Sequence, residues 1–180
     1  MLKLTTECAF AASSTLCAGM GAVYDVRSRR IPNFLTLPAI VFGLLLHAVC
    51  GGWWQLITAA AGGLICGLIF FVFYLAGGMG AGDVKLITAA GCLGGLSLIG
   101  QLLILTALAG GVMAIGLALY RRQLMETCHN MHTLAVHHAI MGLTPHPRFN
   151  VSNDRTLRLP YALAIATGSG LSLCLVAMQR

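Results

Sequence analysis

Long apolar stretches separated by short polar or glycine-rich segments dominate this chain of 180 residues. A membrane-spanning helix needs about 20 mainly apolar residues, because the hydrocarbon core of a bilayer is about 30 Å thick. The pattern therefore predicts an all-α, polytopic membrane helix bundle of about six transmembrane helices, built as a single domain over residues 1–180. The predicted spans are residues 8–24, 34–50, 53–76, 84–99, 101–120 and 159–178. Between the fourth and fifth, near "LSLIGQ", one long broken helix would give a similar pattern.

Composition agrees with this interpretation. Hydrophobic residues make up 58% of the chain and charged residues only 9%, whereas a soluble domain carries about 25% charge. The seven cysteines are scattered, mostly inside apolar stretches, and no two form a CxxC pair. A thiol in such a place usually behaves as a small hydrophobic group. We therefore expect no disulfide framework, no metal site and no cofactor.

The basic residues predict the orientation. If the 25–33 loop is cytoplasmic, the 77–84 loop and the polar segment 121–158 are cytoplasmic too. Nine of the eleven basic residues then lie on that side, and only Lys3 and Arg180 lie on the other. Such asymmetry is typical of membrane proteins, so we expect an N-terminus outside, a retained first helix rather than a signal peptide, and no nucleic-acid partner. The nine are Arg27, Arg29, Arg30, Lys85, Arg121, Arg122, Arg148, Arg155 and Arg158.

Two of the five acidic residues are placed at the ends of predicted spans. Asp25 follows the first span and Asp83 precedes the fourth, so both face the cytoplasm at a similar depth. For each aspartate a purely structural role is also open: Asp25 can mark the membrane boundary, and Asp83 can be a helix N-cap. As a pair they predict more, because two carboxylates that share a site hold one proton between them. The ionised member can activate water while the protonated one polarises a peptide carbonyl.

The segment "GGMGAGDVKL" at 77–86 leads into Asp83. Gly78, Gly80 and Gly82 alternate there, and each permits backbone angles or close approaches that other residues resist. We expect them to line a polar crevice around Asp83, since irregular backbone at membrane depth must border protein or a water-filled cavity. Lys85 has three open roles: it stabilises ionised Asp83, touches a substrate, or marks the boundary by snorkelling. Elsewhere, the GxxxG spacing of Gly63 and Gly67 predicts close helix packing.

At these residues the chain resembles the prepilin peptidases, in particular their small Flp-type (tight-adherence) branch. The family pattern is an aspartate before R-x-I-P-N and then G-x-G-x-G-D-x-K. Here Asp25 precedes "RRIPN" at 29–33, and the second motif fills positions 78–85. The segment "LPYALAIATG" at 159–168 is similar to the final helix of that branch. The resemblance covers the first four helices and the last, but not 121–158.

The resemblance implies a GxGD-type intramembrane aspartyl protease of the bacterial inner (cytoplasmic) membrane. Such enzymes remove the basic leader of type IV prepilins or pseudopilins at the cytoplasmic face. Asp25 and Asp83 would be the catalytic pair, and Arg30, Ile31, Pro32 and Asn33 would shape the start of the second helix, with Asn33 as a natural N-cap. Membrane lipid and other pilus or secretion assembly components are further candidate partners.

One departure concerns methylation. Larger prepilin peptidases carry an additional cytoplasmic domain with paired CxxC motifs and also methylate the new N-terminus. Here the 25–33 loop is too short for such a domain and CxxC pairs are absent from the sequence. N-methyltransferase activity is therefore not carried over to this chain.

Five of the six histidines lie in the polar segment, close to Cys128. Pairs three or four residues apart can share a helix face and bind zinc, but a four-ligand signature does not emerge. The favoured interpretation is a solvated, partly helical cytoplasmic loop that docks substrate or an assembly partner. The five are His129, His132, His137, His138 and His146.

Two other functions use the same features. A small ion or solute transporter would bind a cation with the two carboxylates at a broken helix, although an inverted repeat, which is common in transporters, is not found. A non-catalytic assembly subunit would keep the scaffold alone, and it would have little need for the two aspartates. Peptidase activity is therefore the leading hypothesis.

Overall fold

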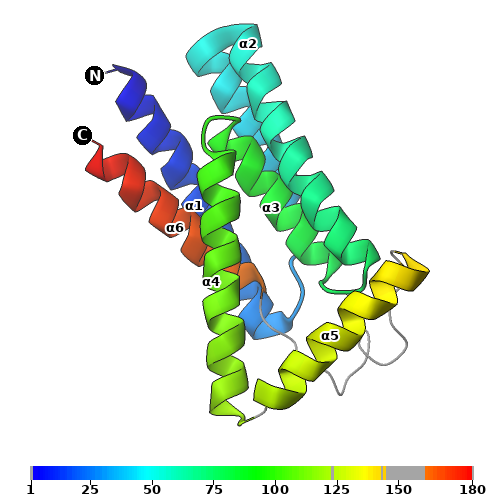
Figure 1. Ribbon diagram of the computed structural model, residues 1–180. Coiled ribbons are helices and arrows are strands. Elements are labelled where there is room, and N and C mark those ends of the chain that lie inside the picture. The colour runs from blue at the N-terminus through cyan, green and yellow to red at the C-terminus, as the bar shows by residue number, and fades with distance from the viewer. Residues whose placement is uncertain (1, 123, 143, 145–160, 180) are drawn as a thin grey trace.

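A computed structural model describes residues 2–122, 124–142, 144 and 161–179. Within these residues the chain forms six α-helices and no strand, which confirms the predicted all-α fold (Figure 1). Helices suit an apolar chain of this kind because they satisfy every backbone hydrogen bond within one segment. The helices are α1 (Leu2–Ser28), α2 (Asn33–Leu75), α3 (Ala81–Gly94), α4 (Ile99–Tyr120), α5 (Leu124–Met141) and α6 (Tyr161–Met178).

The longest helix, α2, folds back on itself. Gly51 and Gly52 leave the helical region in its middle, and Gly52 has φ 68°, a conformation that glycine adopts at little cost. Figure 1 shows the turn at the upper end of the molecule, with the two legs of α2 descending from it. The two spans predicted at 34–50 and 53–76 are therefore present as these legs.

Predicted spans four and five are also two helices, with an earlier break than expected. Gly95 has φ 69° and ends α3, so α4 begins at Ile99 rather than at residue 101. The sequence predicts the break near 99–101, because Leu96, Leu98 and Ile99 extend the apolar stretch past Gly95. The left-handed backbone at Gly95, not a change in hydropathy, ends the helix.

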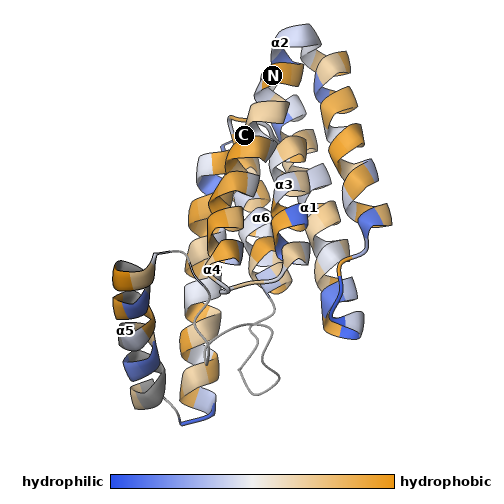
Figure 2. Ribbon diagram, turned by 90° about the vertical axis from the view of Figure 1, so that its right-hand side faces the viewer, coloured by the Kyte–Doolittle hydropathy of each residue, from blue (hydrophilic) through white to orange (hydrophobic). Residues whose placement is uncertain are grey.

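Three of the described helices are long and apolar enough to cross a membrane: α2, α4 and α6. The helix α3, with 14 residues, is shorter than such a span. Much of the ribbon in Figure 2 is coloured as hydrophobic, and many large hydrophobic side chains of the described residues are exposed, among them Leu64 on α2 and Val112 on α4. The protein is thus a helical membrane protein, while six separate spans stay a prediction.

The helix α3 is the centre of the bundle. It packs along α2 on one side and against α1 and α6 on the other, and α6 in turn packs against α1 and α4. Its side chains Leu86, Ile87 and Leu93 are almost completely buried. The bundle thus consists of two groups, α2 with α3 and α1 with α6 and α4, that meet along α3.

Glycines make the α2–α3 contact unusually close. A Cβ atom on Gly62 would lie 2.9 Å from the carbonyl oxygen of Gly91, and one on Gly91 would lie 2.9 Å from the carbonyl oxygen of Gly62. The backbones of the two helices therefore touch at this level. Gly63 and Gly67 face α3 in the same way, through Cys92 and Thr88, which confirms the close packing predicted from their spacing.

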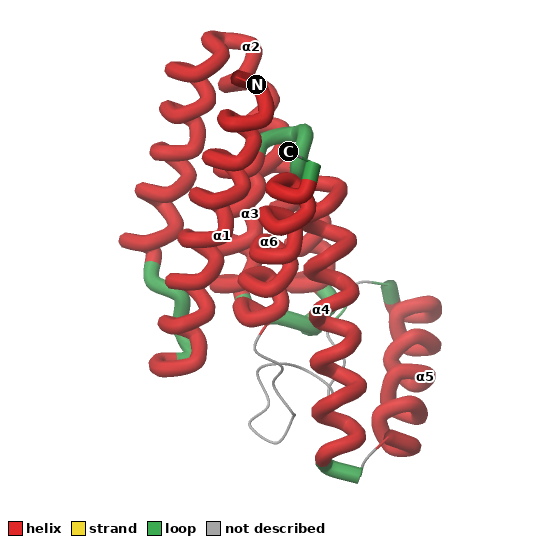
Figure 3. The backbone as a smooth tube through the Cα atoms, turned by 90° about the vertical axis from the view of Figure 1, so that its left-hand side faces the viewer, coloured by secondary structure: helices red, strands yellow, loops and turns green. Residues whose placement is uncertain are grey.

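The turns that carry the two sequence motifs share one end of the bundle. In Figure 1 the α1–α2 and α2–α3 turns lie at the end opposite the two termini and the α2 turn. The helix α5 packs against α4, to one side of the bundle (Figure 3). This helix is part of the polar segment 121–158, for which the sequence predicts a partly helical structure.

Candidate active site

Asp25 and Asp83 come together from two different helices. Asp25 lies in the last turn of α1, three residues before its end, and Asp83 lies in the first turn of α3. Both carboxylates are half-buried. The charge of Asp25 raises the pKa of Asp83, so the two acids predicted as a pair lie within electrostatic reach of each other. Both lie outside the three helices that qualify as membrane spans.

The pKa of Asp83 is raised to about 6. Burial is the largest cause, because a carboxylate loses hydration when it is covered, and the negative charge of Asp25 adds to it. Two backbone N–H groups act in the opposite direction: its own and that of Gly80, which donates to Asp83 Oδ2 at 3.3 Å. Asp83 is therefore neither the N-cap residue, which is Gly80, nor an ordinary surface acid.

Asp25 differs from Asp83 in its neighbours. Burial raises its pKa, but the guanidinium of Arg29 lowers it again. The backbone N–H of Arg29 also donates to the carbonyl oxygen of Asp25 at 2.8 Å, which keeps Arg29 beside this acid. The two carboxylates thus have unequal environments, and this inequality is what separates proton donor from proton acceptor in a carboxylate pair.

Two roles are expected for the glycines before Asp83, unusual backbone angles and close approach, and the structure favours close approach. Gly77, outside the alternating motif, is the residue with positive φ, at 77°, whereas Gly80 has φ −84°. Gly82 is needed for space: a Cβ atom there would lie 3.2 Å from Cβ of Ile31. Close approach, rather than unusual backbone angles, therefore explains Gly80 and Gly82, while Gly78 N–H closes α2 by donating to the carbonyl oxygen of Phe73 at 3.0 Å.

The R-x-I-P-N element reaches the same place from the other side. Pro32 occupies the N-cap position of α2 and has extended backbone angles. Asn33 is the first residue of the helix and follows the N-cap position, so the prediction of Asn33 as N-cap is wrong. Its Oδ1 atom instead accepts a hydrogen bond from Lys85 Nζ at 2.9 Å. Arg30 is exposed, and its carbonyl oxygen accepts from Ser28 Oγ at 3.1 Å.

A third side chain near the carboxylates was missed by sequence reasoning. Tyr161, the first residue of α6, is half-buried and interacts electrostatically with Asp83. It packs against the same buried cluster as Ile31 and Val84. The sequence signal was present in "LPYALAIATG", but that segment was used only to identify a final helix. Its phenol supplies an O–H donor beside the carboxylate pair.

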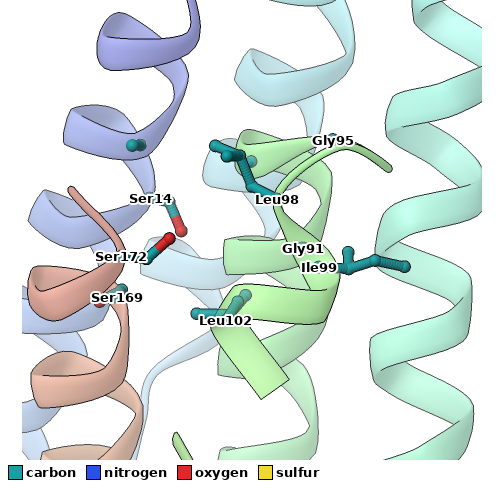
Figure 4. Close-up of a pocket in the computed structure, with 10 residues that line it drawn as sticks. Ser14, Gly91, Gly95, Leu98, Ile99, Leu102, Ser169 and Ser172 are labelled. Carbon is teal, nitrogen blue, oxygen red and sulfur yellow. The ribbon is translucent and has the colours of Figure 1, made fainter. Parts of the chain in front are cut away.

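An interior cavity lies away from the polar crevice expected around Asp83. Figure 4 shows a small cavity between Ser14, Ser169 and Ser172 on one side and residues of α3 and α4, among them Gly91, on the other. Its volume of about 10 Å³ is roughly that needed for one water molecule. Gly91 is eight residues along α3 from Asp83, about 12 Å at the helical rise. This cavity is therefore separate from the carboxylates.

The histidines give no metal centre in the part of the chain that is described. No group of three or more histidine, cysteine, aspartate or glutamate side chains there is placed to hold a metal ion. His129 and His137 lie on α5, whereas His146 lies outside the described residues.

The raised pKa of Asp83 makes a testable prediction. The chain has only three aspartates, Asp25, Asp83 and Asp154, so infrared spectra of protein labelled with carbon-13 at the aspartate carboxyl are simple to assign. The spectrum of the native protein should contain a band of a protonated carboxyl group that is absent from the Asp83→Asn protein. This band should be present at pH 5 and disappear as the pH rises through about 6.

The Asp25→Asn protein tests the coupling between the two acids. Removal of the neighbouring charge should lower the midpoint of Asp83, although burial should keep it above the ordinary value. An unchanged midpoint in Asp25→Asn would contradict the placement of the two acids in one site.

The fold and this site define a helical membrane protein with two carboxylates held together at one end of its bundle. The chain belongs to the type IV leader peptidase family, whose model matches residues 11–115. The matched region contains both Asp25 and Asp83, while Tyr161 lies beyond it.

Curated relatives give the same family. The prepilin leader peptidase/N-methyltransferase of Aeromonas hydrophila is 38% identical over 104 residues, which are 54% of this chain and 36% of the relative. The protein of the same name from Aeromonas salmonicida (strain A449) is 36% identical over 104 residues, which are 54% of this chain and 35% of the relative. The chain therefore matches about a third of the length of these relatives. No solved structure matches it.

Proposed function

We propose that this protein is a membrane aspartyl endopeptidase that removes the basic leader peptide of type IV prepilins or pseudopilins, with Flp-type prepilins as the favoured substrate class. The proposal rests on one observation above all: the charge of Asp25, on a separate helix, raises the pKa of Asp83, and both acids lie inside the region matched by the family. Family membership supports prepilin as the substrate, and the motif resemblance supports the Flp-type branch.

The chemistry follows from one proton shared by two acids. The ionised carboxylate takes a proton from a water molecule, which attacks the carbonyl carbon of the scissile peptide bond. The protonated carboxyl group hydrogen-bonds to the carbonyl oxygen and stabilises the tetrahedral intermediate. Collapse of the intermediate breaks the C–N bond, and a proton passes to the leaving amine. The products are the free leader and a pilin with a new N-terminus.

The location follows from topology. We place the carboxylates at the cytoplasmic face of the bacterial inner membrane, with the N-terminus outside and the chain crossing the membrane several times. One supporting observation is that both motif turns lie at one end of the bundle, which the C-terminal ends of α1 and α4 also reach (Figure 1). The other is that exposed arginines lie at or directly after these two helix ends. They are Arg27, Arg29, Arg30, Arg121 and Arg122. The membrane lipid and other pilus or secretion assembly components are proposed partners.

The transporter alternative receives less support. It requires a discontinuous helix whose two halves meet at the carboxylates. The glycine-rich turn instead joins the second leg of α2 to an α3 that runs back alongside it, so the two helices do not continue along one axis (Figure 1).

A direct cleavage assay tests the proposal. Purified protein in liposomes, mixed with a prepilin from the same source, should shorten the prepilin by its leader, as seen on a gel and by the mass of the product. The mass also reports whether the new N-terminus is methylated, and we expect cleavage without methylation. Intact prepilin after incubation with folded protein, under conditions in which an Aeromonas relative cleaves its own prepilin, would reject the peptidase assignment.

A further inference from the structure

A hydrogen bond joins the two chain segments that carry the carboxylates. Lys85 lies two residues after Asp83 on α3, and Asn33 begins α2 directly after the turn that leads from Asp25. The Nζ atom of Lys85 donates to Oδ1 of Asn33 at 2.9 Å. These partners are 52 residues apart in sequence, so the bond fixes a tertiary relation and not a local one.

A second contact brings the same segments together. Ile31, in the α1–α2 turn, lies over Gly82, where a Cβ atom would be 3.2 Å from the Cβ atom of Ile31. Ile31 and Val84 also pack against the same buried cluster. The turn therefore rests on the first turn of α3, directly beside Asp83.

The turn itself is held closed at its α1 end. The backbone N–H of Arg29 donates to the carbonyl oxygen of Asp25 at 2.8 Å, and Ser28 Oγ donates to the carbonyl oxygen of Tyr24 at 2.8 Å. Arg29 adopts φ 50°, which is uncommon for a residue with a side chain. A movement of Asn33 would therefore be transmitted along a short, constrained turn to Asp25.

Lys85 does not face Asp83. Residues two apart on a helix point in nearly opposite directions, and the Lys85 ammonium is turned to Asn33. The groups that act on Asp83 are Asp25 from α1 and the backbone N–H groups of Gly80 and of Asp83 itself, and Tyr161 from α6 lies within electrostatic reach of Asp83. Direct stabilisation of ionised Asp83, one of the three roles left open for Lys85, is thus disfavoured.

We propose that the Lys85–Asn33 hydrogen bond is a clamp that closes the α1–α2 turn onto α3 and thereby sets the separation of Asp25 and Asp83. Lys85 and Asn33 are then positioning residues, which act through the carboxylates and do not touch the substrate. The inference rests on the proposed function for its activity measurement, but not for its titration measurement.

A double-mutant cycle on cleavage tests the clamp. Lys85→Met keeps the length of the side chain and removes the donor, and Asn33→Ala removes the acceptor. Each should reduce kcat about fivefold or more with little change in KM, and the double variant should be no slower than either single one, because groups in one hydrogen bond are strongly coupled. Lys85→Arg, which keeps a cation and its donors, should recover most of the rate. Arg121→Met, which removes an exposed cation at the end of α4, is the matched control and should cleave normally.

Titration of Asp83 by isotope-edited infrared spectroscopy gives a readout that needs no substrate. Without the clamp, Asp25 should move away from Asp83. The titration midpoint of Asp83 in the Lys85→Met protein should therefore fall toward its midpoint in the Asp25→Asn protein. A merely structural lysine would lower the thermal unfolding temperature and leave this midpoint where it is. If Lys85→Met does not fold, Asn33→Ala carries the same test from the other partner.

The outcomes separate the clamp from the proposed function. A shifted midpoint in a protein that cleaves no prepilin supports the clamp and rejects the peptidase assignment. An active native protein whose Lys85→Met and Asn33→Ala variants have additive effects, an unchanged midpoint or an unchanged rate overturns the clamp.

Discussion

Asp25→Asn and Asp83→Asn proteins are each expected to fold and insert like the native chain but to cleave prepilin at least about 100-fold more slowly, which is the lower range for loss of a general acid or base. Asparagine has the shape of aspartate but cannot exchange a proton with water or with a leaving amine. In the Asp25→Asn protein, Asp83 also titrates differently, because it has lost the charge of its neighbour. The rate of leader removal by purified protein measures the effect.

The double variant and one control make this result specific. Two groups that act as one unit have non-additive effects, so Asp25→Asn/Asp83→Asn should be about as slow as either single variant. Glu7→Gln removes a carboxylate near the other end of α1 and should retain the native rate. Substantial cleavage by either aspartate variant would exclude the paired mechanism, even if the native protein is a peptidase.

Gly62→Leu should be strongly destabilising although it lies away from the carboxylates. A side chain at Gly62 meets the backbone of α3 at Gly91 and Gly95, with gaps of 2.9 Å and 3.0 Å to the first added atom. Backbone atoms cannot turn aside as a flexible side chain can, so α2 and α3 must separate. Overpacking costs about 1–3 kcal/mol, occasionally more, and we expect the upper part of that range, measured as a lower unfolding temperature in detergent.

The matched control for this change is Gly111→Leu. Gly111 is exposed on α4 and has open space where its Cβ atom would be. Leucine there should be neutral or slightly stabilising, because glycine in a helix costs about 1 kcal/mol relative to a good helix former. Equal stability of Gly62→Leu and the native protein would show that α2 and α3 are not in backbone contact.

The helices and the carboxylate pair were predictable from the sequence for different reasons. Hydropathy alone predicts where an apolar segment lies, and the glycine pair at 51–52 falls between two such segments. The pair of aspartates followed from topology, since both lie at span ends that face the same side. The end of α3 was misplaced because Gly95 ends it by backbone conformation, which apolar residues on both sides conceal.

The contacts between distant side chains could not be predicted in this way. Asn33 has the ordinary features of an N-cap residue, but its side chain accepts a hydrogen bond from Lys85, 52 positions later. Tyr161 is an unremarkable aromatic residue in sequence, and only the packing of α6 brings it to Asp83. Local patterns determine which elements form; the partner of a polar side chain depends on how those elements are arranged.

The central position of α3 has one more consequence. Asp83 belongs to the α2–α3 group, whereas Asp25 belongs to the group formed by α1, α6 and α4. Neither group contains both acids, so the distance between the acids depends on how the two groups pack against each other along α3. A shift of one group along α3 relative to the other would therefore change the distance between the acids without unfolding either group.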